Sequence, residues 1–522
     1  MKMATSLLLG SAAGLIMLGG AEAADLAVKA KPVEYVRICS LYGVGFYYIP
    51  GTDTCIKLGG YLRADMLVNS NSVDTGNTSG AGAAGNRFTN AFTWRARQYV
   101  EIDTRTATEY GVVRAFGQLS FTWTDDTQAG TGAGGTVYSL LPGTTNGAAP
   151  FNAGAGNNSF GSFGLYYAFM QFAGFTIGKA QSQFSMPWSN YPGNNFDGLV
   201  GGGGSVIGTN QFSYTAEFGG GVSATISAQD PIQSTQAGVV NVGVGASGLG
   251  TAALGPFGTS DYAGTYAPDF IGNVSVDQAW GMVRASVAAH DNHAAYYGAN
   301  ELTGHPNDVW GYAAQLGATI RNVPTGPGDT INISGVYTNG ATRFNIQDLS
   351  QGAAMTIFGG TNLPGAYQSI GFGMAPDTVF ANNGGSQQRI QTWGMRGGFN
   401  HNWNPYWSSS LYGAYAGVMY SSGAKTLICG NGVTGGSFQA FYGAGVTSCN
   451  PNYGIAQLGL VTRWTPVKNL SFSADLTYTH LAQNMVGTVA YPGSNAIGKP
   501  AATYELKDQD TLLLLLRAQR NF

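Results

Sequence analysis

The chain has 522 residues, of which 80 are glycine, and its formal net charge is −3. Charged residues make up only 10% of it, against roughly 25% in a typical soluble domain. This composition disfavours an ordinary soluble enzyme surface, and the lack of a basic patch disfavours nucleic-acid binding. Disorder of the whole chain is disfavoured by the 12% of aromatic residues.

The first 23 residues have the pattern of a secretory signal peptide. Lys2 precedes an apolar stretch over 7–18, and small residues around Ala21 and Ala23 predict cleavage after Ala23. The stretch is shorter than the roughly 20 residues that a membrane-spanning helix needs. We therefore expect an exported chain that begins near Ala24.

No later segment holds enough consecutive apolar residues for a transmembrane helix. A weakly charged chain can still enter a bilayer as a closed β-barrel, because closure satisfies every backbone hydrogen bond. Segments of about ten residues with period-two alternation are typical of such barrels. In 57–68, for example, Leu58 and Leu62 alternate with Tyr61 and Arg63. A soluble sandwich shows the same alternation, so loop lengths have to separate the two.

Loop lengths favour the membrane barrel. Short turns alternate with long loops rich in Gly, Asn and Ser, as in outer-membrane barrels, whereas a sandwich has no reason to sort them. The sequence predicts an all-β fold, a 16-stranded antiparallel transmembrane β-barrel. The candidate strands are 57–68, 91–104, 111–124, 163–173, 175–181, 209–218, 221–229, 270–278, 280–290, 309–321, 329–339, 388–402, 407–420, 454–465, 469–481 and 510–522.

Aromatic residues recur near the ends of these strands. Tyr and Trp favour the membrane interface because their rings are apolar and their polar tips need water. The pattern therefore predicts two aromatic girdles, although any single residue is equally typical of a packed core. The residues are Trp94, Trp123, Phe163, Phe175, Trp280, Trp310, Trp393, Trp407, Tyr420 and Trp464.

The four cysteines form two sequence-local pairs, Cys39 with Cys55 and Cys429 with Cys449. An even count in an exported chain predicts disulfides, and neither spacing matches a common zinc pattern. We therefore expect two local disulfides.

The five histidines are scattered. His290 and His293 have a spacing that suits a metal, but they lack an obvious third ligand. His480 lies on the apolar face of its strand without a serine partner that would suggest a barrel hydrolase. We expect no catalytic residues, no metal and no cofactor.

The chain ends in an apolar strand whose last residue is Phe522. A terminal aromatic of this kind resembles the recognition signal that the outer-membrane barrel assembly machinery reads. An ordinary buried C-terminal strand would have the same composition, so this segment alone leaves both interpretations open.

A longer resemblance covers residues 31–66, which read KPVEYVRICSLYGVGFYYIPGTDTCIKLGGYLRADM. The segment resembles the start of mature general porins of alphaproteobacterial outer membranes, with two cysteines around a tyrosine-rich turn and a first strand reading GGYLR. The segment FTIGKAQSQF at 175–184 resembles the strand that leads into the inward-folded third loop of porins. The terminal Phe522 is also consistent with this resemblance.

This resemblance implies a division into a signal peptide (1–23), a periplasmic lead (24–56) and a barrel domain (57–522). It also implies an outer-membrane homotrimer through which small hydrophilic solutes and ions diffuse. The partners to expect are outer-membrane lipid, lipopolysaccharide and the barrel assembly machinery.

The pore constriction is predicted between the third loop, 182–208, and an arginine wall. The only acidic residue of this loop is Asp197. Facing it we place four arginines on the polar faces of the first three strands, where opposite charges would set up a transverse field. These are Arg63, Arg95, Arg97 and Arg114. Alternatively, they are solvated lumen residues paired with Asp65, Glu101 or Asp103.

Two other functions share the fold signals. A channel specific for a sugar or phosphate would carry an ordered ladder of aromatics or lysines along the pore. An adhesin would use long loops such as 340–386 and 421–453. The overall charge of −3 mildly favours cations, whereas several arginines at the constriction favour anions. The sequence therefore leaves the ion selectivity open.

Overall fold

The computed structural model describes residues 37–70, 86, 91–124, 162–188, 199–203, 207–242, 260–346, 355–381, 384–430, 445–491, 493 and 499–522. The predicted signal peptide, 1–23, and Asp197 lie outside the described residues.

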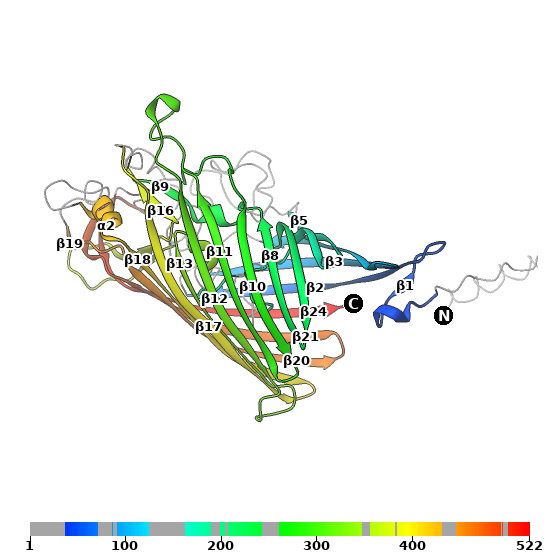
Figure 1. Ribbon diagram of the computed structural model, residues 1–522. Coiled ribbons are helices and arrows are strands. Elements are labelled where there is room, and N and C mark those ends of the chain that lie inside the picture. Colours follow the sequence, from blue (N-terminus) through cyan, green and yellow to red (C-terminus); the bar gives the residue numbers. More distant parts are fainter. Residues whose placement is uncertain are drawn as a thin grey trace, which may run out of the picture.

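The described residues form a closed antiparallel barrel of 16 strands (Figure 1). Its first strand, β2, pairs with the last, β24, and with the second, β3, so that the sheet has no free edge. Around the barrel the strands are β2 (Thr54–Asn69), β3 (Phe92–Thr108), β4 (Gly111–Thr124), β5 (Ser162–Phe172), β6 (Phe175–Ala180), β7 (Thr209–Gly219), β8 (Val222–Gln229), β10 (Asp269–Gln278), β11 (Gly281–Asn292), β12 (Val309–Arg321), β13 (Thr330–Asn339), β17 (Gln388–Asn404), β18 (Trp407–Tyr420), β20 (Tyr453–Val467), β21 (Leu470–Gln483) and β24 (Gln509–Asn521).

The predicted fold class is confirmed, with small shifts at strand ends. The first strand begins at Thr54 rather than at 57, because its pairing with β3 continues to Thr106. None of the helices in the described part of the chain is long and apolar enough to cross a membrane.

Alternation along the strands sorts side chains between the outside and the lumen. On β2, Leu58 and Leu62 are 52% and 56% exposed, whereas Asp65 on the opposite face is only 1% exposed. Large apolar side chains that remain exposed on successive strands form the lipid-facing wall expected of a membrane barrel. The polar face, with its arginines, therefore points inward.

Some of the long loops contain regular structure in their described parts. Parts of three of them join in a second, five-stranded sheet. Its strands are β14 (Met355–Gly359), β15 (Gln368–Gly373), β19 (Val446–Ser448), β22 (Val486–Tyr491) and β23 (Ala502–Leu506). Phe358, Tyr491 and Tyr504 pack beneath it. The outer vestibule therefore has a hydrophobic core of its own.

Both predicted disulfides are present. Cys39–Cys55 joins the segment before β1 (Tyr47–Tyr48) to β2, and Cys429–Cys449 joins the end of α2 (Ser422–Cys429) to the residue after β19. In Figure 1, α2 and β19 lie at one end of the barrel and β1 lies at the other. Each disulfide therefore ties down a segment beyond one rim.

Short elements complete the described structure. Two strands that lie parallel to each other, β9 (Val239–Asn241) and β16 (Thr378–Phe380), come from the loops after β8 and β13. The single-turn helices are η1 (Ser40–Tyr42), η3 (Ser234–Ala237), η5 (Glu301–Thr303) and η6 (Thr342–Phe344).

Candidate functional site

The third loop follows β6 and lies against the inner wall of the barrel. Phe184 is fully buried, with its ring 4.7 Å from that of Phe344. The carbonyl oxygen of Gln183 accepts a hydrogen bond from Asn273 Nδ2 (2.8 Å), and that of Ser185 accepts one from Arg284 (3.1 Å). The first half of the loop is therefore fixed to β10 and β11.

The second half of the loop is held by β17 and β20. The Arg396 guanidinium of β17 donates to the carbonyl oxygens of Leu199 (3.3 Å) and Gly203 (2.9 Å), and it lies 5.7 Å from the Trp188 ring. The Val200 N–H donates to Gln457 Oε1 of β20 (3.0 Å). Arg396 is only 2% exposed. The loop thus extends along the lumen from β6 to β20.

Glycine lets the loop backbone touch the barrel wall. Gly201 has a φ of +85°, and a Cβ there would lie 2.2 Å from the Met395 carbonyl oxygen. On the wall, a Cβ on Gly394 would lie 2.8 Å from Gly201 Cα. Only glycine allows this approach on both sides, which explains two of the many glycines in the sequence.

Arg63 and Arg97 lie opposite each other on β2 and β3. Arg63 Nε donates to Gln519 Oε1 and Arg97 Nε donates to Thr122 Oγ1, each at 2.8 Å. Among the described residues, no carboxylate forms a salt bridge with either. Their charges are thus held in place by neutral groups, and in the described part of the chain no acidic side chain pairs with them.

Aromatic residues on the outer wall show where the arginine pair lies along the barrel axis. The Phe522 ring packs on Gly60, and Phe92 is the register partner of Val68. Arg63 lies between these two positions on β2. The arginine pair is therefore between the aromatic levels that mark the membrane interfaces.

A row of tyrosines supports the pair. Tyr61 and Tyr99 stack at 4.4 Å, and Tyr166 meets Tyr99 edge-on at 5.1 Å. The Arg63 guanidinium lies 4.3 Å from the Tyr61 ring, and that of Arg97 lies 5.7 Å from Tyr99, within cation–π range. The three tyrosines come from β2, β3 and β5, so the row runs around the wall rather than along the pore axis.

The other two predicted arginines have different surroundings. Arg95 is the register partner of Asp65, one inward position from the Arg63 pair, and Asp65 accepts a 2.6 Å bond from Arg517. Arg114 Nη2 lies 3.0 Å from Asp103, which also binds Arg105. The structure thus brings Arg63 and Arg97 together, with Arg95 beside them.

Arg114 lies apart from this group. Its register partner is Arg105, close to the turn after Thr108 that joins β3 to β4. Arg114 is therefore a lumen arginine paired with a carboxylate, which is the alternative to a role in the constriction.

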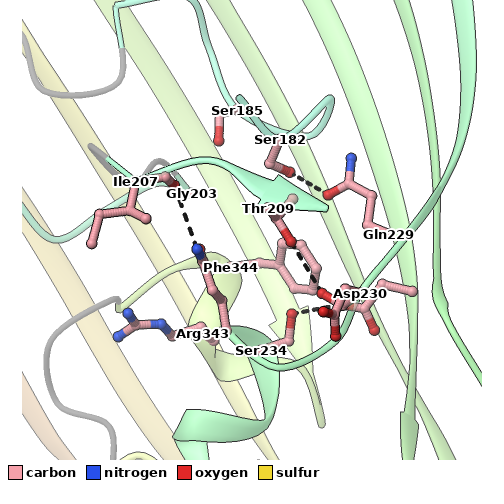
Figure 2. A pocket seen from close by; sticks show the side chains of 12 residues that line it. Ser182, Ser185, Gly203, Ile207, Thr209, Gln229, Asp230, Ser234, Arg343 and Phe344 are labelled. Carbon is pink, nitrogen blue, oxygen red and sulfur yellow. Dashed lines mark hydrogen bonds between the residues drawn. The ribbon is translucent and has the colours of Figure 1, made fainter. Parts of the chain in front are cut away.

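Behind the third loop is a polar pocket, shown in Figure 2. Ser182 of the loop donates to Gln229 Oε1 (2.8 Å), and Ser234 of η3 donates to Asp269 Oδ2 (2.5 Å). Arg343 and Phe344 of η6 close the other side. Three loops therefore meet inside the barrel at this point.

A buried imidazole on β11 connects two of these loops, those after β8 and β13. His290 Nδ1 lies 2.5 Å from Asp269 Oδ1, its Nε2 lies 3.6 Å from Asp377 Oδ2, and all three side chains are at most 3% exposed. Tyr262 OH bonds both His290 and Asp377 (2.7 and 2.9 Å). Removing one member of such a buried ion pair leaves the other charge buried without a partner, which strongly destabilises the folded protein.

We predict that His290→Leu destabilises the barrel by about 3–5 kcal/mol, because Asp269 and Asp377 then stay buried without the imidazole. The measurement is the midpoint of thermal loss of the β-sheet circular dichroism signal. His305→Gln is the control, since the described contacts of His305 are with the neighbouring Pro306 carbonyl oxygen (2.9 Å) and, edge-on, with the Tyr296 ring, and neither involves a buried charge. An equal midpoint for both variants would contradict this role of His290.

Comparisons with known proteins agree with this architecture. A sequence model of the porin subfamily matches residues 25–515. The chain is 30% identical over 396 residues to porin Omp2b of Brucella neotomae, covering 73% of this chain and 93% of that protein. It is also 30% identical over 396 residues to porin Omp2a of Brucella ovis, covering 73% and 99%.

Among solved structures, the outer membrane channel DcaP of Acinetobacter baumannii is similar in fold. It superimposes with a TM-score of 0.54 at 14% sequence identity, covering 91% of this chain and 99% of that one. With the subfamily match across nearly the whole barrel, these findings establish that the chain is an outer-membrane channel and belongs to the porin subfamily.

Proposed function

We propose that the third loop and the arginine wall form the narrowest section of the pore. The observation that carries this proposal is the fixation of the loop by Arg396 and Gln457 on β17 and β20. Arg63 and Arg97 lie on β2 and β3, a part of the wall away from these anchors. Small hydrophilic solutes and ions would pass between them by diffusion.

The charges give this section an anion preference. Arg63 and Arg97 contribute two cations that no described carboxylate pairs with, while the nearby Asp65 is bound to Arg517. Cationic groups held against a low-dielectric wall raise the local concentration of anions. We place Asp197 on the loop side, where one carboxylate would leave the section net positive and add a transverse field.

We further propose that three barrels assemble in the outer membrane. The resemblance of residues 31–66 to general porins supports this assembly. Phe522 is 61% exposed at the outer wall, and its N–H donates to the Gly60 carbonyl (3.1 Å). This position supports recognition of the last strand by the barrel assembly machinery, and the apolar wall supports contact with lipid and lipopolysaccharide.

A sugar-specific channel is the second candidate, because Tyr61, Tyr99 and Tyr166 form an aromatic row on the inner wall. Sugar transport along a pore needs stacking positions at successive heights. These three rings form one row around the wall, from β2, β3 and β5, where Tyr61 and Tyr99 support the two arginines. The row therefore favours arginine positioning over a sugar path.

Liposome swelling tests general diffusion against specific transport. We expect vesicles that contain the protein to swell in solutions of uncharged sugars at rates that fall steadily with solute size. The rate should rise in proportion to sugar concentration, because an open pore has no binding step to saturate. Saturation by one sugar, or swelling with that sugar alone, would contradict the proposal and favour the specific channel.

A further inference from the structure

Three potential metal ligands converge at the loop end of β11. Asp291 belongs to this strand, His293 follows it, and Asp308 immediately precedes β12. One ligand atom from each side chain lies within 4.8 Å of the other two. His293 Nδ1 is 2.9 Å from Asp308 Oδ1. The cluster is not visible in the sequence because Asp308 lies 15 residues after His293 and is brought beside it by the pairing of β11 with β12.

The buried member of the cluster, Asp291, lacks a partner for one of its carboxylate oxygens. Asp291 is 7% exposed, and its Oδ1 is buried without a hydrogen-bond partner. A buried carboxylate oxygen without a donor is costly, since it has lost its water and gained nothing in return. A bound cation would supply the missing partner. This is an observation independent of the spacing of the three residues.

A buried glutamine side chain fixes the backbone next to two of the three ligands. The Gln387 amide, 6% exposed, donates to the carbonyl oxygens of Asn292 (2.8 Å) and Asn307 (3.0 Å). These residues immediately precede His293 and Asp308. Thr378 Oγ1 in turn donates to Gln387 Oε1 (2.6 Å). One side chain thus holds both ligand segments together, as a preorganised site requires.

The His293 ring also has a fixed orientation. Tyr266 stacks on it, with ring centroids 5.5 Å apart, and the Ala263 N–H donates to the His293 carbonyl at 2.9 Å. Its neighbour in sequence, His290, points into the lumen towards Asp269 and Asp377. The two histidines therefore cannot bind one ion together, and the third member of the cluster is Asp308, just before β12.

We propose that Asp291, His293 and Asp308 bind a divalent cation of the zinc class. One imidazole and two carboxylates suit Zn²⁺, whereas Ca²⁺ and Mg²⁺ prefer oxygen ligands alone. Zinc bonds of about 2.0–2.1 Å in a tetrahedron place neighbouring ligand atoms roughly 3.3 Å apart, so small side-chain shifts would complete the site. Water or an exogenous anion would take the fourth position.

The bound ion would fasten the loop between β11 and β12 to the barrel rim. Asp291 is the register partner of Trp310, and Phe270 stacks on Trp310 at 6.2 Å. Both rings are about half exposed on the outer wall. The site is therefore outside the channel lumen, at the aromatic level of the barrel, so the ion would affect the rim rather than the constriction.

The test is calorimetric titration of Zn²⁺ into the full-length mature protein, folded in detergent, untagged and stripped of metal by a chelator. We expect one Zn²⁺ per chain. His293→Gln and Asp291→Asn should each weaken binding at least 10-fold. Asp510→Asn is the matched control, because His480 and Asp510 form an exposed pair at 2.7 Å but, within the described part of the chain, no third metal-ligating side chain lies beside them.

Unchanged binding in His293→Gln would overturn the site, and so would the absence of Zn²⁺ binding by the folded wild type. Ca²⁺ binding that is tighter than Zn²⁺ binding and survives His293→Gln would overturn the assignment to the zinc class. If Asp291→Asn fails to fold, His293→Gln still decides, because this partly exposed side chain is not part of the core. Binding of Co²⁺ with a visible absorption band lost in His293→Gln would support the imidazole ligand.

Discussion

Replacing both Arg63 and Arg97 with glutamate is expected to reverse the ion preference of the channel from anions to cations. The two guanidiniums are register partners on the inner wall, and no described carboxylate pairs with them. Two charges about 4 Å apart interact by roughly 1 kcal/mol in water and by roughly 4 kcal/mol at an effective dielectric constant of 20. A reversal of two charges at the narrowest section should therefore change the permeability ratio by about tenfold or more.

The measurement is the zero-current potential across a planar bilayer under a potassium chloride gradient, which should change sign in the double variant. Arg97→Gln and Arg114→Gln form a matched pair, since each removes one positive charge from the lumen. Arg97→Gln should shift the potential clearly. Arg114→Gln should shift it little, because Arg114 is bound to Asp103 near the β3–β4 turn. Equal shifts would contradict the placement of the constriction at Arg63 and Arg97.

Arg396→Met is expected to release the third loop from the wall. The guanidinium donates to the carbonyl oxygens of Leu199 and Gly203, and both bonds are buried. Each carbonyl left without a donor costs about 1–3 kcal/mol. The thioether fills most of the space but replaces neither bond. The variant should still form a barrel, because the strand pairing of β17 does not depend on this side chain.

Single-channel recordings should show the effect as larger and more variable current levels, because the loop no longer holds one position. The swelling assay should admit larger sugars than the wild type admits. Arg321→Met is the control: Arg321 is 38% exposed and binds Asp277 at the barrel surface, away from the loop. Steady currents of wild-type size in Arg396→Met would mean that Arg396 does not hold the constriction.

The barrel strands could be predicted because period-two alternation and turn residues are local signals. On β2, apolar Leu58 and Leu62 and polar Arg63 alternate without interruption, so the face that each side chain takes follows from parity. The disulfides were predictable for a similar reason, since each pair is close in sequence. The strands of the second sheet are only a few residues long, and too short to show a period.

The contacts inside the lumen could not be predicted, because they join residues far apart in the sequence. Nothing in the sequence around Arg396 shows that its partners are carbonyl oxygens of the third loop. His290 looked like one of two spaced histidines, yet its partners Asp269 and Asp377 come from a different strand and a different loop. Arg114 is on the inward face of its strand like the other arginines, but it lies near the β3–β4 turn, beside Asp103.

We propose that this porin is an open channel narrowed by the third loop against a cationic wall. Single-channel recording of the wild-type protein in a planar bilayer under a salt gradient is the decisive experiment. We predict large currents that are proportional to voltage, closure in three steps as the three proposed barrels shut, and a zero-current potential of the sign for anion preference. A folded barrel without conductance, or a small conductance that one sugar or phosphate blocks, would contradict the claim.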